Sequence, residues 1–242
     1  MFGSFANVAI YRLPRGLSIV SPCSACPRCT RPITWYDNLP LFSYLFLRGR
    51  CRHCGERISG RYPLVEAAVG ALWVLLFLRI GWQAELPAFL AFGTVLVILS
   101  AIDLEHRRLP NRVLGPAAVL GLVLLVGAGG LSGDWFRMLQ SLLGAAAYGV
   151  PMFLIALAVP AGMGGGDVKF APYLGLHLGW FGLSTVFVGA FLAFLLGGIS
   201  GIVLILLKRK GRKDALPFGP FMALGALTAV LVGGSLVRLW LG

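Results

Sequence analysis

Two aspartates beside apolar runs are the residues whose type and position point most clearly to chemistry. The chain has only nine Asp and Glu residues, and most of them fall in loops between apolar runs. Asp103, Glu105 and Asp167 fall instead at the predicted boundary of a membrane, where ionisable groups are costly and are functional candidates by default. Three glycines, Gly164, Gly165 and Gly166, directly precede Asp167.

A pair of aspartates on the same side of a membrane could perform acid–base hydrolysis. Two carboxylates brought together cannot both ionise easily, so one of them keeps a proton. One member can then deprotonate water while the other protonates a scissile carbonyl, and the sequence leaves open which does which. The preceding glycines would let the backbone approach a neighbouring helix or an extended substrate closely. A helix cap or an arginine partner is the structural alternative for either aspartate alone.

Two neighbours of the pair are weaker candidates. Lys169 lies two residues beyond Asp167 and could tune the pair electrostatically, or it could extend its ammonium to the membrane interface. Glu105 lies two residues beyond Asp103 and is a candidate for substrate contact, with a solvated loop position as the alternative.

Four cysteines form two C-x2-C pairs that are separated by 21 residues: Cys26, Cys29, Cys51 and Cys54. Four thiolates at such a spacing can surround one Zn²⁺ tetrahedrally, at about 2.3 Å each. A site with four cysteines has no open coordination position, so the metal would be structural rather than catalytic. A redox role is the alternative, and we interpret Cys23 as a spare thiol.

The composition indicates an integral membrane protein. Hydrophobic residues make up 58% of the 242 residues and charged residues 12%, whereas a soluble domain carries about 25% charged residues. Several apolar runs approach or exceed the roughly 20 residues that cross a bilayer as a helix. These runs are 64–80, 86–102, 113–131, 139–160, 168–207 and 216–241.

We expect an all-α polytopic membrane protein with about eight transmembrane helices. The run 168–207 is long enough for two short spans, which we expect to turn near 178–180. The apolar run at the beginning of the chain is only half a span, and we expect it to be completed upstream. The predicted parts are a partial first span (1–11), a zinc-ribbon-like loop domain with the four-cysteine site (12–63) and a transmembrane domain with the aspartate pair (64–242).

Basic residues predict the orientation in the membrane. Nine arginines lie within 12–61, and a second basic cluster occupies 208–213. Basic loops beside apolar spans mark the cytoplasmic side. This orientation places the cysteine loop and both aspartates on the cytoplasmic side. The net charge of +12 is thereby explained without nucleic acid, whose binding sites would add interleaved aromatic residues on a soluble module.

Several motifs in order resemble one family, the type IV prepilin leader peptidases, which are bacterial GxGD aspartic proteases. The resemblance covers nearly the whole chain. It rests on the opening segment 3–14, the cysteine quartet, the segments 35–40 and 61–66, the segment that begins at Asp103, the GGGD motif at 164–167 and the PFGP motif at 217–220.

The resemblance implies an activity, a substrate and a location. Members of this family cleave the leader from prepilins and pseudopilins on the cytoplasmic side of the bacterial inner membrane, and Asp103 and Asp167 would be the catalytic pair. Many members also methylate the new N-terminus with S-adenosylmethionine. The expected partners are therefore prepilins of type IV pili or pseudopilins of type II secretion, together with membrane lipids.

The residues alone leave two other interpretations open. The segment 198–201, GISG, matches the GxSG of rhomboid serine proteases, but such chemistry needs a histidine that activates the serine. The three histidines all lie upstream of Ser200, whereas rhomboids have theirs on a later span. The protein could also be a zinc-ribbon membrane scaffold or an ion- or proton-coupled transporter with the aspartates as a relay.

Overall fold

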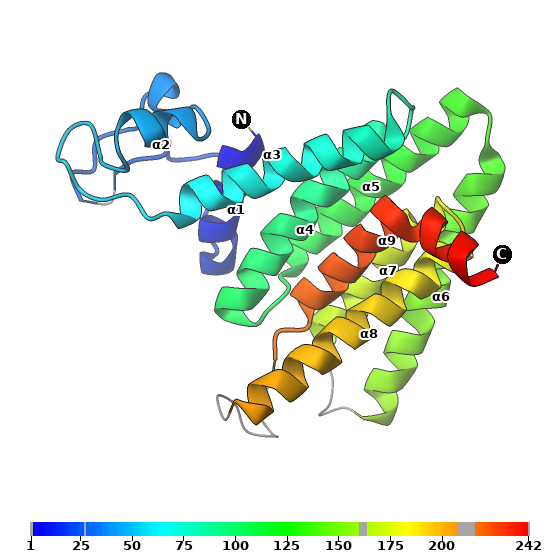
Figure 1. Cartoon of the computed structure of the whole chain (residues 1–242). Coiled ribbons are helices and arrows are strands. Elements are labelled where there is room, and N and C mark those ends of the chain that lie inside the picture. Colours follow the sequence, from blue (N-terminus) through cyan, green and yellow to red (C-terminus); the bar gives the residue numbers. More distant parts are fainter. Residues whose placement is uncertain (1, 27, 160–163, 208–215, 242) are drawn as a thin grey trace. The chain divides into compact units, whose positions relative to one another are not determined.

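The computed structural model describes residues 2–26, 28–159, 164–207 and 216–241 (Figure 1). The described residues form helices and no strands, apart from two isolated β-bridges. The elements in chain order are α1 (Phe2–Arg12), η1 (Leu13–Arg15), η2 (Trp35–Asn38), α2 (Phe42–Phe46), α3 (Arg61–Ile80), α4 (Leu86–His106), α5 (Asn111–Ser132), α6 (Trp135–Ala158), α7 (Gly165–Gly179), α8 (Leu183–Leu206) and α9 (Gly219–Leu241).

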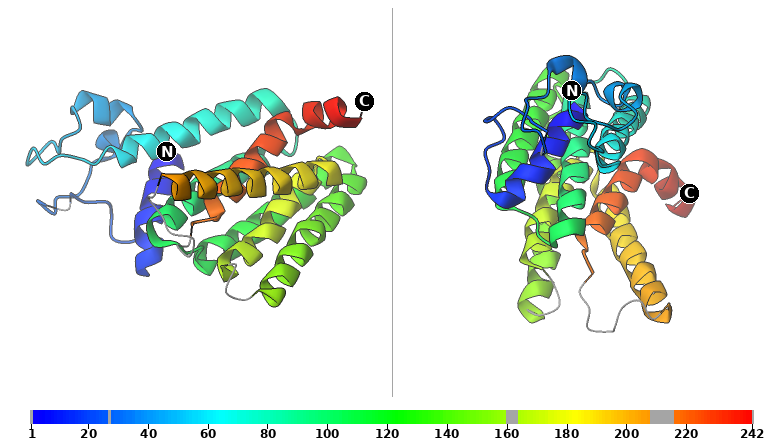
Figure 2. Two further views of the ribbon diagram at one scale, coloured as in Figure 1. Left: turned by 60° about the horizontal axis from the view of Figure 1, so that its bottom comes forward. Right: turned by 90° about the vertical axis from the view of Figure 1, so that its left-hand side faces the viewer.

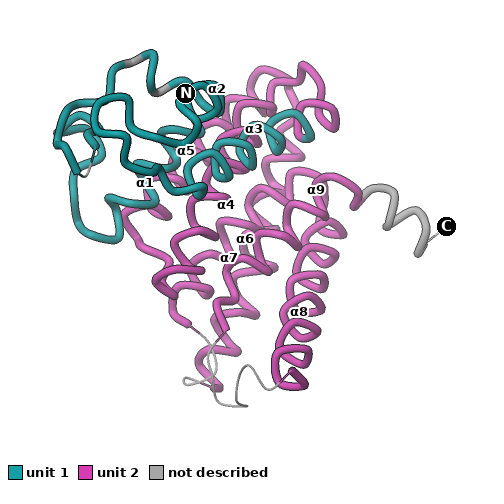
Figure 3. The backbone as a smooth tube through the Cα atoms, turned by 60° about the vertical axis from the view of Figure 1, so that its left-hand side comes forward, with its two compact units in different colours: residues 1–75 teal, residues 76–242 magenta. Residues whose placement is uncertain are grey.

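The chain divides into two compact units, residues 1–75 and residues 76–242 (Figure 3). The division falls inside α3. Unit 1 contains the cysteine loop and the short helices, and unit 2 contains the long helices from α4 onwards together with the end of α3.

Polar contacts hold α1 against the start of α3 within unit 1. Ser4 Oγ donates to Glu66 Oε1 over 2.7 Å, and Asn7 Nδ2 donates to the carbonyl oxygen of Tyr62 over 3.0 Å. The other carboxylate oxygen of Glu66 accepts the N–H of Leu41 at 2.9 Å. The carboxylate therefore ties three segments of unit 1 together, which is a structural role.

Five described helices are long and apolar enough to cross a membrane: α3, α4, α5, α6 and α8. The all-α membrane class predicted from composition is thus confirmed. The turn expected near 178–180 is also confirmed, because α7 ends at Gly179 and α8 begins at Leu183. Most of the α4 span is buried and little of the α8 span is, so α4 lies in the interior of unit 2.

The helix α6 begins earlier than the apolar run predicted. Its first residue is Trp135, four residues before the expected start at 139. The cause is a local cap, since the side chain of Asp134 accepts the backbone N–H of Arg137. An Asp at this position satisfies a donor that the first helical turn leaves unpaired.

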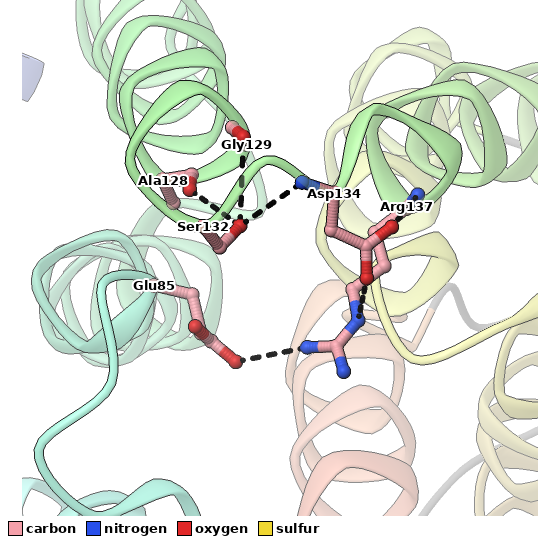
Figure 4. A network of polar contacts seen from close by, with 6 residues as sticks. All are labelled: Glu85, Ala128, Gly129, Ser132, Asp134 and Arg137. Carbon is pink, nitrogen blue, oxygen red and sulfur yellow. Dashed lines mark hydrogen bonds and ion pairs between the residues drawn. The ribbon is translucent and has the colours of Figure 1, made fainter.

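The same cap belongs to a network of polar groups at one end of unit 2 (Figure 4). Arg137 donates through Nη1 to Glu85 at 3.3 Å and forms an ion pair through Nε with Asp134 at 3.0 Å. Ser132 Oγ donates to the carbonyl oxygen of Ala128 over 2.8 Å. Glu85 is only 5% exposed, so Arg137 supplies the partner that a buried carboxylate needs.

Glycines let α6 and α7 pack closely. A Cβ at Gly144 would overlap the carbonyl oxygen of Gly175, and a Cβ at Gly179 would overlap that of Gln140. The reversed order of these contacts shows that the two helices are antiparallel. Small residues permit such close backbone approach between membrane helices. The helices α8 and α9 also lie side by side, as the views in Figures 1 and 2 show.

We predict that Gly175→Ala destabilises the protein more than Gly115→Ala. Both changes gain about 1 kcal/mol of helix propensity, but only the first forces a methyl group into a neighbouring backbone, at a cost of roughly 1–3 kcal/mol. Nothing lies within 4 Å of a Cβ at Gly115. Thermal unfolding in detergent should show a lower Tm for Gly175→Ala alone, and equal Tm values for both variants would contradict the packing described.

Candidate active site and metal site

Asp103 lies in the last turn of α4, and its side chain is buried. The residue is 5% exposed. The helix ends because Arg107 adopts a left-handed conformation, with φ 51°, and its N–H bonds to the carbonyl oxygen of Asp103 at 2.8 Å. The chain then turns through Leu109, which is also buried, and Pro110 leads into α5.

The carboxylate of Asp103 meets the beginning of α9. The backbone N–H of Gly219 donates to Asp103 Oδ2 over 3.0 Å in a buried hydrogen bond between residues 116 positions apart. An amide donor supports the charged form of a carboxylate that burial removes from water.

Asp167 lies in the first turn of α7. Gly164 precedes the helix as its N-cap, and the N–H of Asp167 donates to the Gly164 carbonyl oxygen over 3.0 Å. A Cβ at position 164 would lie 3.1 Å from Asp167 Oδ2 and would crowd the carboxylate. A Cβ at Gly166 would likewise lie 3.0 Å from Leu109 Cβ, whereas nothing lies within 4 Å of a Cβ at Gly165.

Leu109 connects the two aspartate segments. Its Cβ lies 3.0 Å from the place of a Cβ at Gly166, and its Cδ2 lies 3.4 Å from that of a Cβ at Gly219. The side chain thus separates the start of α7 from the start of α9. The carboxylates of Asp103 and Asp167 lie within range of electrostatic interaction. The two residues selected from the sequence are therefore brought together by α4 and α7.

The two weaker candidates have partners of their own. Lys169 Nζ donates to Asn111 Oδ1 over 3.3 Å, so it links the start of α7 to the start of α5. Glu105 is paired with His106 at 3.9 Å. Tuning of the pair by Lys169 and substrate contact by Glu105 stay predictions.

Sequence reasoning missed the contacts that Gly219 and Leu109 make with the aspartate segments. Neither residue carries an ionisable or nucleophilic group, and their contacts join segments that are far apart in the chain. The PFGP motif was the available signal, since it made Gly219 part of the family resemblance without assigning it a contact.

The four predicted cysteine ligands come together in unit 1. The Sγ atoms of Cys26, Cys29, Cys51 and Cys54 all lie within 4.8 Å of one another, and those of Cys26 and Cys54 are 3.7 Å apart. Tetrahedral ligands at about 2.3 Å from Zn²⁺ have sulfurs roughly 3.8 Å apart. The donor set and its geometry therefore fit a zinc ion. Cys23 is exposed and lies outside this cluster.

Each cysteine pair forms the same backbone turn. The N–H of Thr30 donates to the carbonyl oxygen of Cys26 at 2.9 Å, and the N–H of Gly55 donates to that of Cys51 at 3.0 Å. Both donors have left-handed φ angles, 56° and 70°. The backbone N–H groups of Cys29 and Arg28 lower the pKa of the Cys26 thiol to about 6. This favours the thiolate, the form that binds metal.

Ion pairs join the two turns to the rest of the loop. Arg28 of the first turn pairs with Glu56 of the second. Arg52 binds both carboxylate oxygens of Asp37, at 2.6 to 3.0 Å, and this contact lowers the pKa of Asp37 below its usual value. A bidentate pair of this kind fixes orientation as well as distance.

Five described helices of membrane-crossing length define a polytopic membrane protein, in which Asp103 lies at the end of α4 and Asp167 at the start of α7. Residues 1–80 match the Bacterial Peptidase A24 N-terminal domain, and residues 90–206 match the Type IV leader peptidase family. No solved structure matches the chain.

Curated relatives agree with both matches. A protein of Bacillus subtilis (strain 168) named "Prepilin leader peptidase/N-methyltransferase" is 34% identical over 100% of this chain and 94% of its own length. A protein of the same name in Aeromonas salmonicida (strain A449) is 35% identical over 100% of this chain and 90% of its own length. Another in Myxococcus xanthus (strain DK1622) is 40% identical over 84% of this chain and 60% of its own length. The chain therefore belongs to the type IV leader peptidase family.

We predict that the purified protein binds one zinc ion and that Cys51→Ser removes it. Loss of one thiolate leaves three ligands and an open position, which weakens a structural site strongly. Metal analysis by mass spectrometry should find about one zinc per chain in the unaltered protein, and the same amount in the matched control Cys23→Ser. Zinc retained at full stoichiometry by Cys51→Ser would disprove the assigned ligand set.

Proposed function

We propose that this protein is a membrane aspartic endopeptidase that removes the leader peptide from type IV prepilins or type II secretion pseudopilins. The observation that carries the proposal is the convergence of Asp103 and Asp167 from α4 and α7 around Leu109. Family membership and the names of the relatives supply the substrate class.

In this proposal the two carboxylates act as one acid–base pair. One carboxylate takes a proton from water, whose oxygen attacks the scissile carbonyl carbon, and the other carboxyl gives its proton to the carbonyl oxygen. Glycines around the pair leave room for the extended backbone of the substrate, since a backbone without side chains can be approached closely. The segment 164–167 with Gly165 open on one side supports such an approach.

We place the reaction at the cytoplasmic face of the bacterial inner membrane. The support is the arginine-rich segment 12–61 and the basic cluster 208–213, which follow the positive-inside rule. The cluster 208–213 lies outside the described residues. The substrate's apolar helix would lie in the bilayer against exposed helices of unit 2, with its cleavage site at the membrane surface.

The cysteine site would hold a structural zinc. When bound, the ion would cross-link the two turns at Cys26 and Cys51, and four thiolate ligands leave no open position for catalysis. The ion pairs of Arg28 and Arg52 would then orient the loop around it.

We further propose a second activity, methylation of the new N-terminus with S-adenosylmethionine. The names of the relatives support it. A cavity of about 650 Å³ in unit 1 has the size of a cofactor pocket. Its lining residues include Tyr11, Tyr44, Tyr62 and Glu66, residue types that suit an adenine ring and a sulfonium cation. When bound, the cofactor would supply the methyl group.

We predict that Asp103→Asn and Asp167→Asn each abolish cleavage of a co-expressed prepilin. Either change removes a proton acceptor or donor from the pair, at a cost of roughly 100- to 10,000-fold in rate. The matched control is Asp134→Asn, because Asn is an equally good N-cap and position 134 is part of the cap of α6. Gel shift and mass spectrometry of the pilin would follow leader removal.

The control variant should cleave at the rate of the unaltered protein. Full cleavage by both Asp103→Asn and Asp167→Asn would reject the aspartate pair, and a serine site would then have to be considered.

For the second activity, we predict that mature pilin made with the unaltered protein carries one methyl group on its N-terminus. Mass spectrometry with a labelled methyl donor would measure it. A pilin that is cleaved yet unmethylated in the presence of the donor would disprove methylation and leave the peptidase proposal standing.

A further inference from the structure

The PFGP motif at 217–220 contacts the aspartate pair directly. Gly219 is the first residue of α9, a helix of 23 residues. Its backbone N–H donates to Asp103 Oδ2 over 3.0 Å, and the bond is buried. The motif therefore supplies a donor to one member of the pair, a role that its sequence alone does not indicate.

Glycine at position 219 leaves the space that this contact needs. A Cβ at Gly219 would lie 2.8 Å from Asp103 Oδ2, 3.3 Å from Asp103 Cγ and 3.4 Å from Leu109 Cδ2. Real Cβ atoms essentially never approach another atom as closely as 2.8 Å, so a side chain at position 219 would make the Asp103 carboxylate shift. The bare backbone is what lets the N–H reach the oxygen.

Neighbouring aromatic packing holds the donor in place. The ring of Phe218 lies 5.2 Å from that of Phe194 on α8, and it fills the space beside Gly197, where a Cβ would be 2.9 Å from the ring. The carbonyl oxygen of Phe218 accepts the N–H groups of Phe221 and Met222 at 3.0 and 3.1 Å. The first turn of α9 is thus fixed on both sides of Gly219.

The N-terminus of a helix favours negative charge. Its first N–H groups lack partners within the helix, and the helix dipole adds partial positive charge there. Asp103 receives the N–H of the first residue of α9. Asp167 lies in the first turn of its own helix, where its carboxylate interacts with the backbone of Gly164.

Few other charges in the described residues face Asp103. Asp167 on α7 interacts with it electrostatically. On its own helix Glu105 is paired with His106. The turn that follows α4 carries Arg107 and Arg108, both exposed. On the neighbouring helices, the ionisable side chains near this end are Lys169, which is bound to Asn111, and the exposed Arg112. The helix α8 and the described side chains of α9 contribute no charge.

We propose that Gly219 is a positioning residue whose N–H keeps Asp103 ionised, so that Asp103 is the general base and Asp167 the general acid. This inference rests on the proposed peptidase function. Asp103 takes a proton from water as the water oxygen bonds to the carbonyl carbon, and Asp167 gives its proton to the carbonyl oxygen. When the C–N bond breaks, Asp103 passes its proton to the leaving nitrogen, and the hydroxyl proton returns to Asp167.

The test replaces the amide at residue 219 by an ester, through incorporation of glycolic acid in place of glycine. This change removes the N–H and adds no side chain. We expect kcat for prepilin cleavage to fall at least about tenfold, because a hydrogen bond to a charged group is lost. The acid limb of the pH–rate profile should move upwards by about one to two pH units, because the base loses a donor that favours its charge. KM should change little.

The matched control is Gly225→Ala on the same helix. A Cβ there would lie 2.7 Å from the backbone nitrogen of Ala193 on α8 and does not touch Asp103. We expect it to lower the Tm and to leave the pH profile in place. A structural role for Gly219 would instead make the ester and Gly225→Ala behave alike.

Infrared titration separates this inference from the proposed function. The carboxyl band that disappears in Asp103→Asn reports the protonation of Asp103 without any substrate, and in the ester protein it should titrate at higher pH. An unshifted band, or a pH profile in which only the basic limb moves, would overturn the role of Gly219 while leaving the peptidase standing. A protein that cleaves no prepilin but shows the shifted band would overturn the peptidase and leave the Gly219 contact standing.

Discussion

The arrangement of unit 2 depends on keeping two carboxylates together at the end of a membrane helix bundle. A buried carboxylate is costly unless donors or a shared proton compensate it. Asp103 is 5% exposed and finds its donor in the backbone of Gly219. That contact requires the end of α4 and the start of α9 to meet, while Leu109 fixes their spacing from the start of α7. The ends of these helices are therefore positioned so that the buried carboxylates have polar partners, and the apolar spans determine where the ends lie.

Close packing between helix backbones fixes the positions of the helices that carry Asp167 and Gly219. Between α6 and α7, Gly144 and Gly175 leave no space for a side chain, and Gly225 does the same between α9 and α8. Lipid offers no hydrophobic drive for helices to associate, so such close contacts contribute much of the stability of a membrane bundle. The contact of Gly144 with Gly175 holds α7, the helix that carries Asp167. The contact of Gly225 with α8 holds α9, the helix that begins at Gly219. In unit 1, the cluster of four cysteines and the ion pairs of Arg28 and Arg52 connect the loop segments instead.

The features that could be predicted from the sequence are those with local signals. Apolar length gives the spans, C-x2-C spacing gives the cluster of four cysteines, and the scarcity of carboxylates singles out Asp103 and Asp167. The start of α6 was predicted too late, because the cap by Asp134 is a polar feature outside the apolar run. The Gly219 contact could not be foreseen, since it joins residues 116 positions apart and the donor is a backbone group that every residue except proline has.

A double-substitution cycle tests most directly whether Asp103 and Asp167 act as one catalytic unit. Prepilin cleavage would be measured for Asp103→Asn, Asp167→Asn and the doubly changed protein, each inserted stably in membranes. If one proton is shared between the two carboxylates, either single change disables the pair, and the double variant is about as slow as the singles. Rate losses that multiply in the double variant would show two independent sites and would contradict the account of a shared-proton pair.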